Sequence, residues 1–326
     1  MQNIHPRIEQ VGARFFEANV VYLYLLRGEK NIIIDTGINQ SPERDILPFL
    51  KIHSLTLSDI HLILNTHDHP DHTGGNAAMK AASGAHIYIH KDDVPFLNDP
   101  EHGFEFYAAP VIRAMGGNLQ AGKQALLAMA GPVVVSDQQF EDGDIIDGGP
   151  GVKLSVIHLP GHTPGSVGFF WEEEGILFSG DSVAGLHDAG AGGKLPVIFD
   201  LLAYQKSLRR LQELPIRSLL CAHNYRAIRL PPTPVRQGRD VKQFVQDSQE
   251  FTERLDEAIT TVASHPFEKG FREFADEVIA QFPKEMGFKP LTQVERPFLS
   301  AQTIFFRHSQ LTQQGKKDGL KEEKKG

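Results

Sequence analysis

The segment Thr66-His67-Asp68-His69-Pro70-Asp71-His72-Thr73-Gly74-Gly75 places three histidines and two aspartates within six residues. It directly follows LILN (62–65), a short apolar run that is typical of a buried strand. A helix cannot direct all of these side chains at one point, whereas a loop at the end of a strand can. Neutral imidazole nitrogens and carboxylate oxygens are ligands that suit zinc, iron or manganese. The segment therefore predicts a metal-binding loop at a strand end.

Three later segments have the same organisation, with a histidine or an aspartate just after an apolar strand. They are LPGHTPGS (159–166) with His162, FSGD (178–181) with Asp181, and LLCAHN (219–224) with His223. The carboxyl ends of strands are where α/β proteins assemble their sites. A surface loop that is rich in histidine by chance is the alternative interpretation, but it does not account for four strand ends that each offer a ligand. We therefore expect the four segments to meet at one metal site.

The pattern along the rest of the chain predicts an α/β protein with two sheet-rich halves. Residues 20–26 (VVYLYLL) and 31–35 (NIIID) predict a hairpin, and strand-like runs resume after residue 135. Residues 91–135 are rich in Phe, Ala, Met and Leu and predict a helical insertion. We expect a main domain over 1–239, a helical C-terminal extension over 240–307, and a charged, disordered tail over 308–326.

The composition of the chain indicates a globular protein and disfavours several other classes. The chain has 326 residues, a net charge of −8 and 40% hydrophobic residues, which is typical of a globular protein and disfavours nucleic acid as a partner. Cys221 is the only cysteine, so no intrachain disulfide can form. There is no signal-peptide pattern at the N-terminus and no run of about 18 apolar residues that could span a membrane. We expect a cytoplasmic protein that does not enter a membrane.

The ordered motifs HxHxDH, GHTPGS, SGD and AHN, together with Asp35-Thr36-Gly37, resemble those of the metallo-beta-lactamase superfamily. The resemblance covers Asn19 to Asn224 and implies an αββα four-layer sandwich, here with the helical insertion and the helical extension. It also implies that His67, His69 and His162 hold a first metal ion. Asp71, His72 and His223 then hold a second metal ion, and Asp181 bridges the two.

Two positions indicate which branch of the superfamily the chain resembles. The antibiotic-degrading branch has a cysteine where this chain has Asp181, and it lacks the last histidine of the HxHxDH motif, here His72. Both positions instead resemble the branch of hydroxyacylglutathione hydrolases and lactonases. The segment Ala222-His223-Asn224-Tyr225 is also similar to segments of hydroxyacylglutathione hydrolases and persulfide dioxygenases. A basic segment that binds glutathione is not recognisable after it.

We therefore expect a hydrolase with two divalent metal ions, zinc first and iron or manganese as alternatives. A metal-bridging hydroxide would attack a small carboxylic ester-type substrate, either a thioester or a lactone, with Asp71 and Asp181 as catalytic residues. One alternative is a phosphodiesterase that uses the same site, although the composition gives no hint of a basic groove. Another is a mononuclear iron dioxygenase that uses one histidine of the first cluster, His162 and Asp181 as a two-His-one-carboxylate face, although Asp71, His72 and His223 would then be redundant. A non-enzymatic binding module is disfavoured because all seven ligands are present.

Two further residues are expected to bind the small-molecule substrate. His187 lies in a glycine-rich loop after Asp181, and Tyr225 follows His223. Asp35 is expected to support the metal loop from behind the ligands. The apolar insertion and the C-terminal helices predict either a pocket for a hydrophobic acyl group or a packing surface, which would include the interface of a homodimer.

Overall fold

The computed structural model describes residues 4–15, 19–188, 193–264 and 270–323, and it describes no side chains for residues 187–188 and 315–323. Its first sheet contains the strands β1 (Ile8–Phe15), β2 (Asn19–Leu26), β3 (Asn31–Ile34), β4 (Ile60–Leu64), β5 (His86–His90) and β6 (Gln138–Phe140). They are adjacent in this order. β1, β2 and β3 pair antiparallel, and β3 through β6 pair parallel. The predicted hairpin is therefore present, whereas β1 was not predicted.

The second sheet contains β7 (Ile145–Asp147), β8 (Lys153–His158), β9 (Val167–Trp171), β10 (Ile176–Gly180), β12 (Ser218–Cys221) and β14 (Val235–Gln237). Its order is β14-β12-β10-β9-β8-β7. β10 and β12 are parallel, so their carboxyl ends lie at the same edge. A small third sheet pairs β11 (His187–Asp188) with β13 (Tyr225–Arg226).

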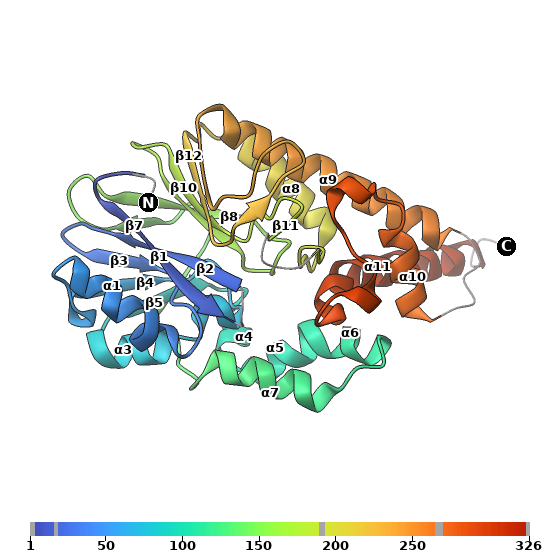
Figure 1. Cartoon of the computed structure of the whole chain (residues 1–326), viewed down its shortest axis with the longest axis horizontal. Coiled ribbons are helices and arrows are strands. Elements are labelled where there is room, and N and C mark those ends of the chain that lie inside the picture. The colour runs from blue at the N-terminus through green and yellow to red at the C-terminus, as the bar shows by residue number, and fades with distance from the viewer. Residues whose placement is uncertain (1–3, 16–18, 189–192, 265–269, 324–326) are drawn as a thin grey trace.

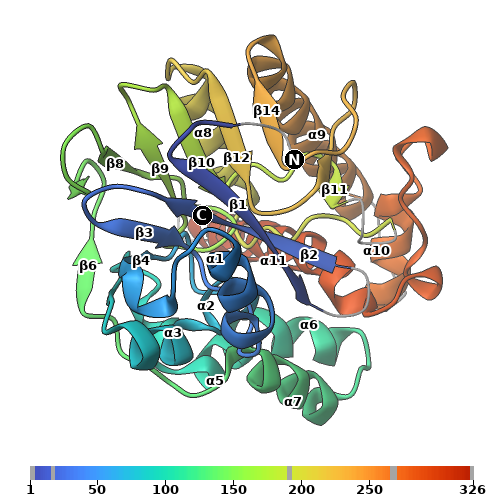
Figure 2. The ribbon, with the colours of Figure 1, turned by 60° about the vertical axis from the view of Figure 1, so that its left-hand side comes forward.

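The two large sheets pack face to face, and alternation along the strands divides the apolar side chains between layers. Ile32 and Ile34 of β3 join Phe169 and Phe178 of the second sheet in the central core. Ile33, which points the other way, packs with the helices on the outer face of the first sheet. Figure 1 and Figure 2 show helices outside both sheets. The predicted αββα sandwich is confirmed.

The helices that cover the first sheet are short. They are η1 (Pro42–Ile46), α1 (Leu47–Ile52), η2 (Leu57–Asp59), α2 (Pro70–Thr73) and α3 (Asn76–Ser83). The second sheet is covered by α8 (Leu201–Gln212) and the long α9 (Arg239–Ala263). α9 buries Val241, Phe244, Phe251, Leu255 and Ile259, and this spacing of three, four and seven residues makes one apolar face.

The predicted insertion is helical. It comprises α4 (Val94–Asn98), α5 (Pro100–Gly103), η3 (Phe104–Ala108), α6 (Ala109–Ala114) and α7 (Leu119–Ala130). Phe104, Ala109 and Ile112 form a small core of their own, and Phe298 from the C-terminal region packs against it. The insertion therefore packs on the C-terminal helices as well as on its neighbours in sequence.

The C-terminal region continues after α9 with α10 (Phe271–Ile279), η5 (Lys284–Met286), η6 (Leu291–Gln293) and α11 (Pro297–Glu323). These helices share one hydrophobic cluster with the outer face of the second sheet. α11 runs through residues 308–323, most of the segment for which a disordered tail was expected. Leu311 packs against the shared cluster, and this apolar anchor holds the start of the charged segment in the helix. Within the described residues, no helix combines the length and the apolar character needed to cross a membrane.

Candidate metal centre

All seven predicted ligands lie after the carboxyl ends of strands and come together at one edge of the two sheets. His67 and His69 lie in the loop after β4, and Asp71 and His72 lie in α2. His162, Asp181 and His223 follow β8, β10 and β12. Their ligand atoms fall into three groups whose members lie within 4.8 Å of one another, namely His67/His69/His162, His67/His72/Asp181 and Asp71/His72/His223.

Local backbone features hold the metal loop in this position. Pro70 is the first residue of α2, where its fixed φ favours the helix, and the amides of His72 and Thr73 donate to the carbonyl of His69 at 2.9 and 3.0 Å. Gly180 at the end of β10 has a φ of +50°, and a Cβ there would collide with Thr66 of the loop. Only glycine therefore allows the end of β10 to approach the loop this closely.

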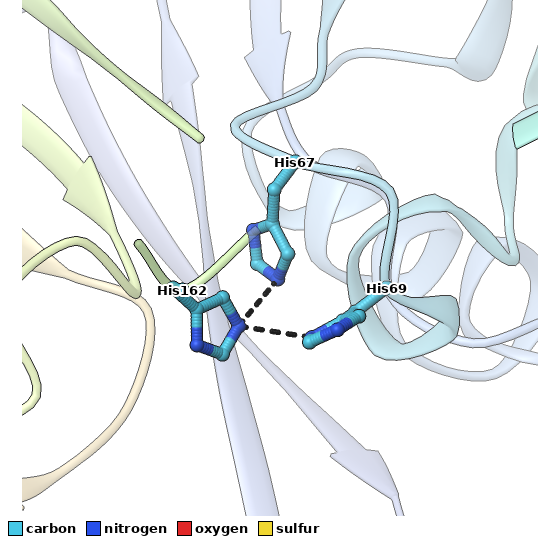
Figure 3. A group of neighbouring side chains, drawn as sticks. All are labelled: His67, His69 and His162. Carbon is cyan, nitrogen blue, oxygen red and sulfur yellow. Dashed lines mark hydrogen bonds between the residues drawn. The ribbon is translucent and has the colours of Figure 1, made fainter. Parts of the chain in front are cut away.

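The first group is built from three imidazoles (Figure 3). His162 Nε2 lies 3.1 Å from His67 Nε2 and 2.9 Å from His69 Nδ1. The rings are steeply inclined to one another, with interplanar angles of 75–86° for the two pairs that include His162. Three nitrogens thus converge from two loops that are far apart in the sequence.

The two carboxylates lie beside the remaining imidazoles. Asp181 Oδ2 is 3.5 Å from Nε2 of both His162 and His223, and 3.8 Å from Nε2 of His72. Asp71 Oδ2 is 3.4 Å from His223 Nε2 and 3.7 Å from His72 Nε2. Asp181 therefore lies between the first imidazole group and the second.

Hydrogen bonds behind the site fix which imidazole nitrogen faces inward. His162 Nδ1 lies 2.6 Å from the carbonyl oxygen of Val197, and His223 Nδ1 lies 3.1 Å from that of Val20. A carbonyl oxygen only accepts, so each Nδ1 carries the proton and donates. In a neutral ring Nε2 then presents a lone pair to the site, as a metal ligand requires.

Asp35 makes the same arrangement for two more histidines. Its Oδ2 accepts from His72 Nδ1 at 2.8 Å and from the Thr66 hydroxyl at 2.8 Å, while its Oδ1 accepts from the Thr66 amide at 2.8 Å. Because the Thr66 proton is donated to Asp35, the Thr66 oxygen can accept from His67 Nδ1, which lies 3.1 Å away. Asp35 is buried and has a φ of +61°, a conformation that aspartate tolerates better than most residues. The expected supporting role of Asp35 is confirmed.

For His67, His69, Asp71 and Asp181 the protonation preferences are those that metal binding needs. Burial, with smaller contributions from neighbouring imidazoles, lowers the pKa of His67 well below its usual value and that of His69 to about 3. Burial raises the pKa of both Asp71 and Asp181. The neighbouring imidazoles together lower the pKa of each by more than burial raises it, so both carboxylates are ionised. Burial lowers the pKa of His72, but the carboxylates of Asp71, Asp35 and Asp181 raise it to about 9, so this part of the site favours positive charge.

Two buried polar atoms of the site lack hydrogen-bond partners within the described part of the chain, which bears on whether cations fit here. Nε2 of His72 and Oδ1 of Asp181 are buried and have no hydrogen-bond partner among the described residues. Leaving such atoms unpaired costs about 1–3 kcal/mol each, more when the group is charged. Converging lone pairs, ionised carboxylates and unpaired ligand atoms are together what divalent cations require, so the residues fit a metal centre.

The structure also shows a connection between the two metal loops that sequence reasoning missed. The buried carboxylate of Asp93 accepts from the Asp68 amide at 3.1 Å, the Thr163 hydroxyl at 2.7 Å and the Gly165 amide at 2.6 Å. Burial raises the pKa of Asp93 to about 6, although these donors lower it. Asp93 lies three residues after the end of β5, so an aspartate close to a strand end was the sequence feature that could have identified it.

The two predicted substrate-binding residues have different outcomes. Tyr225 is buried, its ring lies 5.6 Å from that of His223, and it lines the cavity described below. The backbone of His187 pairs with Arg226 in the small third sheet, but the His187 side chain lies outside the described residues. Cys221 is fully buried, and burial raises the pKa of its thiol to about 11, which makes it unsuited to act as a nucleophile.

A cavity of about 560 Å³ opens above the ligands. His69, Asp71, His162, Asp181 and His223 lie at one end of it. Much of the remainder is lined by the insertion, by residues 194–197 and by the start of α11. The insertion and the C-terminal region thus form the walls of the space in front of the metal ligands.

Comparison with known proteins agrees with this geometry. The sequence profile described as the metallo-beta-lactamase superfamily matches residues 14–223, which includes every predicted ligand. Among curated proteins, a hydroxyacylglutathione hydrolase from Bdellovibrio bacteriovorus is 27% identical over 70% of this chain and 73% of its own length. Another from Rhodospirillum rubrum is 32% identical over 50% of this chain, a match that spans about half (48%) of that protein.

A further relative matches almost the whole chain. It is an atrochrysone carboxyl ACP thioesterase from Claviceps purpurea, 25% identical over 90% of this chain and 88% of its own length. Among solved structures, a metallo-beta-lactamase family protein from Thermus thermophilus superimposes with a TM-score of 0.70 at 21% identity, covering 96% of this chain and 95% of that one. From the matched profile, the fold and the curated relatives together, the chain belongs to the metallo-beta-lactamase superfamily and is a metal-dependent hydrolase.

Proposed function

We propose that this protein hydrolyses thioesters of small acyl compounds at a centre of two divalent metal ions, with lactones as the related alternative. The observation that carries the proposal is the position of Asp181, whose Oδ2 lies between the imidazoles of the first and second groups. His67, His69 and His162 would hold the first ion, Asp71, His72 and His223 the second, and Asp181 both. Zinc suits these ligands, and iron and manganese are the alternatives.

Metal ions held in this way lower the pKa of water and polarise the substrate carbonyl. The chain's own residues orient the reactants. Asp71 is ionised and lines the cavity, so its Oδ2 can accept a hydrogen bond from the attacking water and align it. Tyr225 lines the same end of the cavity and would contact the substrate. No side-chain nucleophile is needed.

The relatives favour acyl transfer to water over the other reactions. The Claviceps protein is named a thioesterase, and the bacterial ones are named hydrolases of hydroxyacylglutathione. A phosphodiester substrate would be favoured by a strongly basic groove, whereas three aspartates line the metal end of this cavity, namely Asp68, Asp71 and Asp181. We therefore place thioester hydrolysis first.

The test is elemental analysis of the purified protein combined with a panel of substrates, namely a thioester, a lactone and bis-nitrophenyl phosphate. We expect close to two metal ions per chain and hydrolysis of the thioester. Cleavage of the phosphodiester instead would contradict the proposal and indicate a phosphodiesterase. A single iron per chain without hydrolysis would contradict it and indicate a dioxygenase.

A further inference from the structure

The cavity in front of the metal ligands has a wall of small and apolar side chains on α7. Ala121, Gly122, Ala125, Leu126 and Met129 all line it. Their spacing of three and four residues puts them on one face of the helix. A Cβ on Gly122 would lie 2.7 Å from Ile112 Cδ1, so α7 approaches α6 closely at this point. The small side chains on this face leave room for a ligand beside the helix.

The lining is also apolar where it comes from two other parts of the chain. α6 contributes Ile112, and Met115 follows it, while Phe298 and Leu299 come from the start of α11. Phe104 and Tyr107 also line the cavity. Figure 1 shows the insertion helices and the C-terminal helices side by side, in agreement with the packing of Phe298 on Phe104 and Ile112. An acyl group that leaves the metal ligands would therefore enter an apolar channel.

The size of the cavity exceeds what a short hydroxyacyl group needs. A volume of about 560 Å³ lies within the range of about 300–1,000 Å³ that holds ligands of drug size. An apolar wall gains little from a small hydroxylated group, whereas each buried methylene adds roughly three- to fourfold in affinity. Volume and wall chemistry thus favour a bulky apolar acyl group.

The acidic residues that line the cavity belong to its metal end, whereas its basic residues come from other parts of the lining. Outside the metal end, the charged side chains among its described lining residues are Lys194, Arg272 and Arg296. Arg272 Nη2 donates to the carbonyl of Met115 at 3.1 Å, which holds its guanidinium beside the apolar channel. An anionic group on the substrate would find its partners here.

We propose that the substrate is an amphipathic acyl thioester, with a bulky apolar acyl group in the part of the cavity that α6, α7 and the start of α11 line (the apolar channel), and an anionic group at Lys194, Arg272 and Arg296. This inference rests on the proposed thioester hydrolysis and names its substrate class. The anion is either a phosphate of the thiol carrier or a carboxylate on the acyl chain, and both present the same chemistry to the three cations.

The first experiment tests whether the apolar channel binds the acyl group, by measuring how the rate depends on acyl chain length. kcat/KM is determined for acetyl, hexanoyl and decanoyl thioesters of N-acetylcysteamine, an uncharged carrier, with the wild type, Ala125→Phe and Ala128→Phe. Both alanines are exposed residues of α7, but only Ala125 lines the cavity. We expect kcat/KM to rise more than tenfold from acetyl to decanoyl, and Ala125→Phe to remove this rise while Ala128→Phe keeps it.

Calorimetric binding of S-decyl-N-acetylcysteamine, a thioether that cannot be hydrolysed, is measured alongside. Weaker binding to Ala125→Phe than to Ala128→Phe supports the channel, and equal binding overturns it. If acetyl and decanoyl thioesters are hydrolysed equally well, the channel is overturned while the proposed function stands. If no thioester is hydrolysed but the thioether binds as expected, the proposed function fails and the apolar site is retained.

The second experiment tests whether Lys194, Arg272 and Arg296 recognise an anionic group on the substrate. Decanoyl-coenzyme A and an ω-carboxydecanoyl thioester of N-acetylcysteamine are compared with the uncharged decanoyl thioester, using the wild type, Arg272→Gln and Arg239→Gln. Arg239 is an exposed arginine that does not line the cavity. We expect one anionic substrate to exceed the uncharged one by more than tenfold in kcat/KM, and Arg272→Gln alone to lose this preference. The preferred substrate identifies whether the anion lies on the carrier or on the acyl chain.

Damage to the packing by Arg272→Gln would lower the rate with the uncharged thioester as well, so an unchanged rate with that substrate separates recognition from structure. Equal rates for all three substrates in the wild type would overturn the anionic part of the proposal.

Discussion

Oδ2 of Asp35 accepts a hydrogen bond from Nδ1 of His72 at 2.8 Å, across 37 residues of sequence. Asp35 immediately follows β3 and His72 lies in α2, so one carboxylate connects the first sheet to a predicted metal ligand. The same carboxylate holds Thr66, which in turn supports His67. Asp35 thus orients a ligand of each proposed metal ion without being a ligand.

Replacing Asp35 with Asn is expected to lower metal affinity by about 10- to 100-fold, because the neutral amide supports His72 and Thr66 less well. Asn tolerates the positive φ of this position, so the backbone should be retained. The measurement is a competition titration with a chromogenic chelator. Asp240→Asn, on the exposed start of α9, is the control. Affinity within twofold of the wild type for Asp35→Asn would show that the hydrogen bond to His72 is dispensable.

Asp181→Ala is expected to lower kcat by more than about 100-fold and to reduce the metal content toward one ion per chain, because it removes the carboxylate between the two groups of ligands. The readouts are turnover, elemental analysis and circular dichroism, the last of which should be unchanged. Ser182→Ala, at the next buried position, serves as the matched control. Full activity with normal metal content in Asp181→Ala would exclude the two-metal mechanism.

Asp93→Ala is expected to reduce the free energy of unfolding by roughly 3 kcal/mol, because it leaves buried donors on both metal loops without an acceptor. The measurement is urea unfolding of the metal-loaded protein. Thr163→Ser keeps the hydroxyl that donates to Asp93 and should lose much less stability. If the two variants lose equal stability, Asp93 does not connect the loops.

A pH effect on stability is expected at His90, which lies outside the metal centre. Burial, together with the His158 ring stacked at 4.1 Å, lowers the pKa of His90 from 6.5 to about 4. The unfolded chain therefore binds a proton between pH 6.5 and 4 that the folded protein does not. This contribution to stability is present above pH 6.5 and is lost as the pH falls toward 4, by up to about tenfold in the unfolding constant per pH unit.

His90→Phe keeps a ring at this position and removes the titrating group. Urea midpoints at pH 4.5, 5.5 and 7 should show a shallower decline for His90→Phe than for the wild type. Parallel declines in the two proteins would show that His90 does not contribute to the pH dependence.

The candidate metal site was predicted from the sequence more fully than the parts of the fold around it. Strand ends and ligand types were enough to predict that His67, His162 and His223 would meet, because α/β proteins assemble their sites at the carboxyl ends of strands. Asp35 was expected to support the loop, and it does. These predictions depend on short segments, each next to a strand with a clear apolar pattern.

Other features depend on contacts that no local pattern contains. Asp93 acts through two loops, one of which is 70 residues later, so its role required the folded arrangement. β1 alternates too weakly to be predicted alone and is ordered by pairing along the whole length of β2. The helix over residues 308–323 was missed because its composition is charged, while the anchor that starts it, Leu311, packs on distant elements.

The walls of the cavity come from segments of the chain that are synthesised at different times. During synthesis every metal ligand, up to His223, emerges from the ribosome before Phe298 and Leu299 of α11 do. Until then the apolar sides of α6 and α7 lack the partner that covers them in the finished protein. A nascent chain therefore exposes this apolar surface beside the predicted metal ligands, and transiently exposed apolar surface of this kind promotes aggregation until α11 is made.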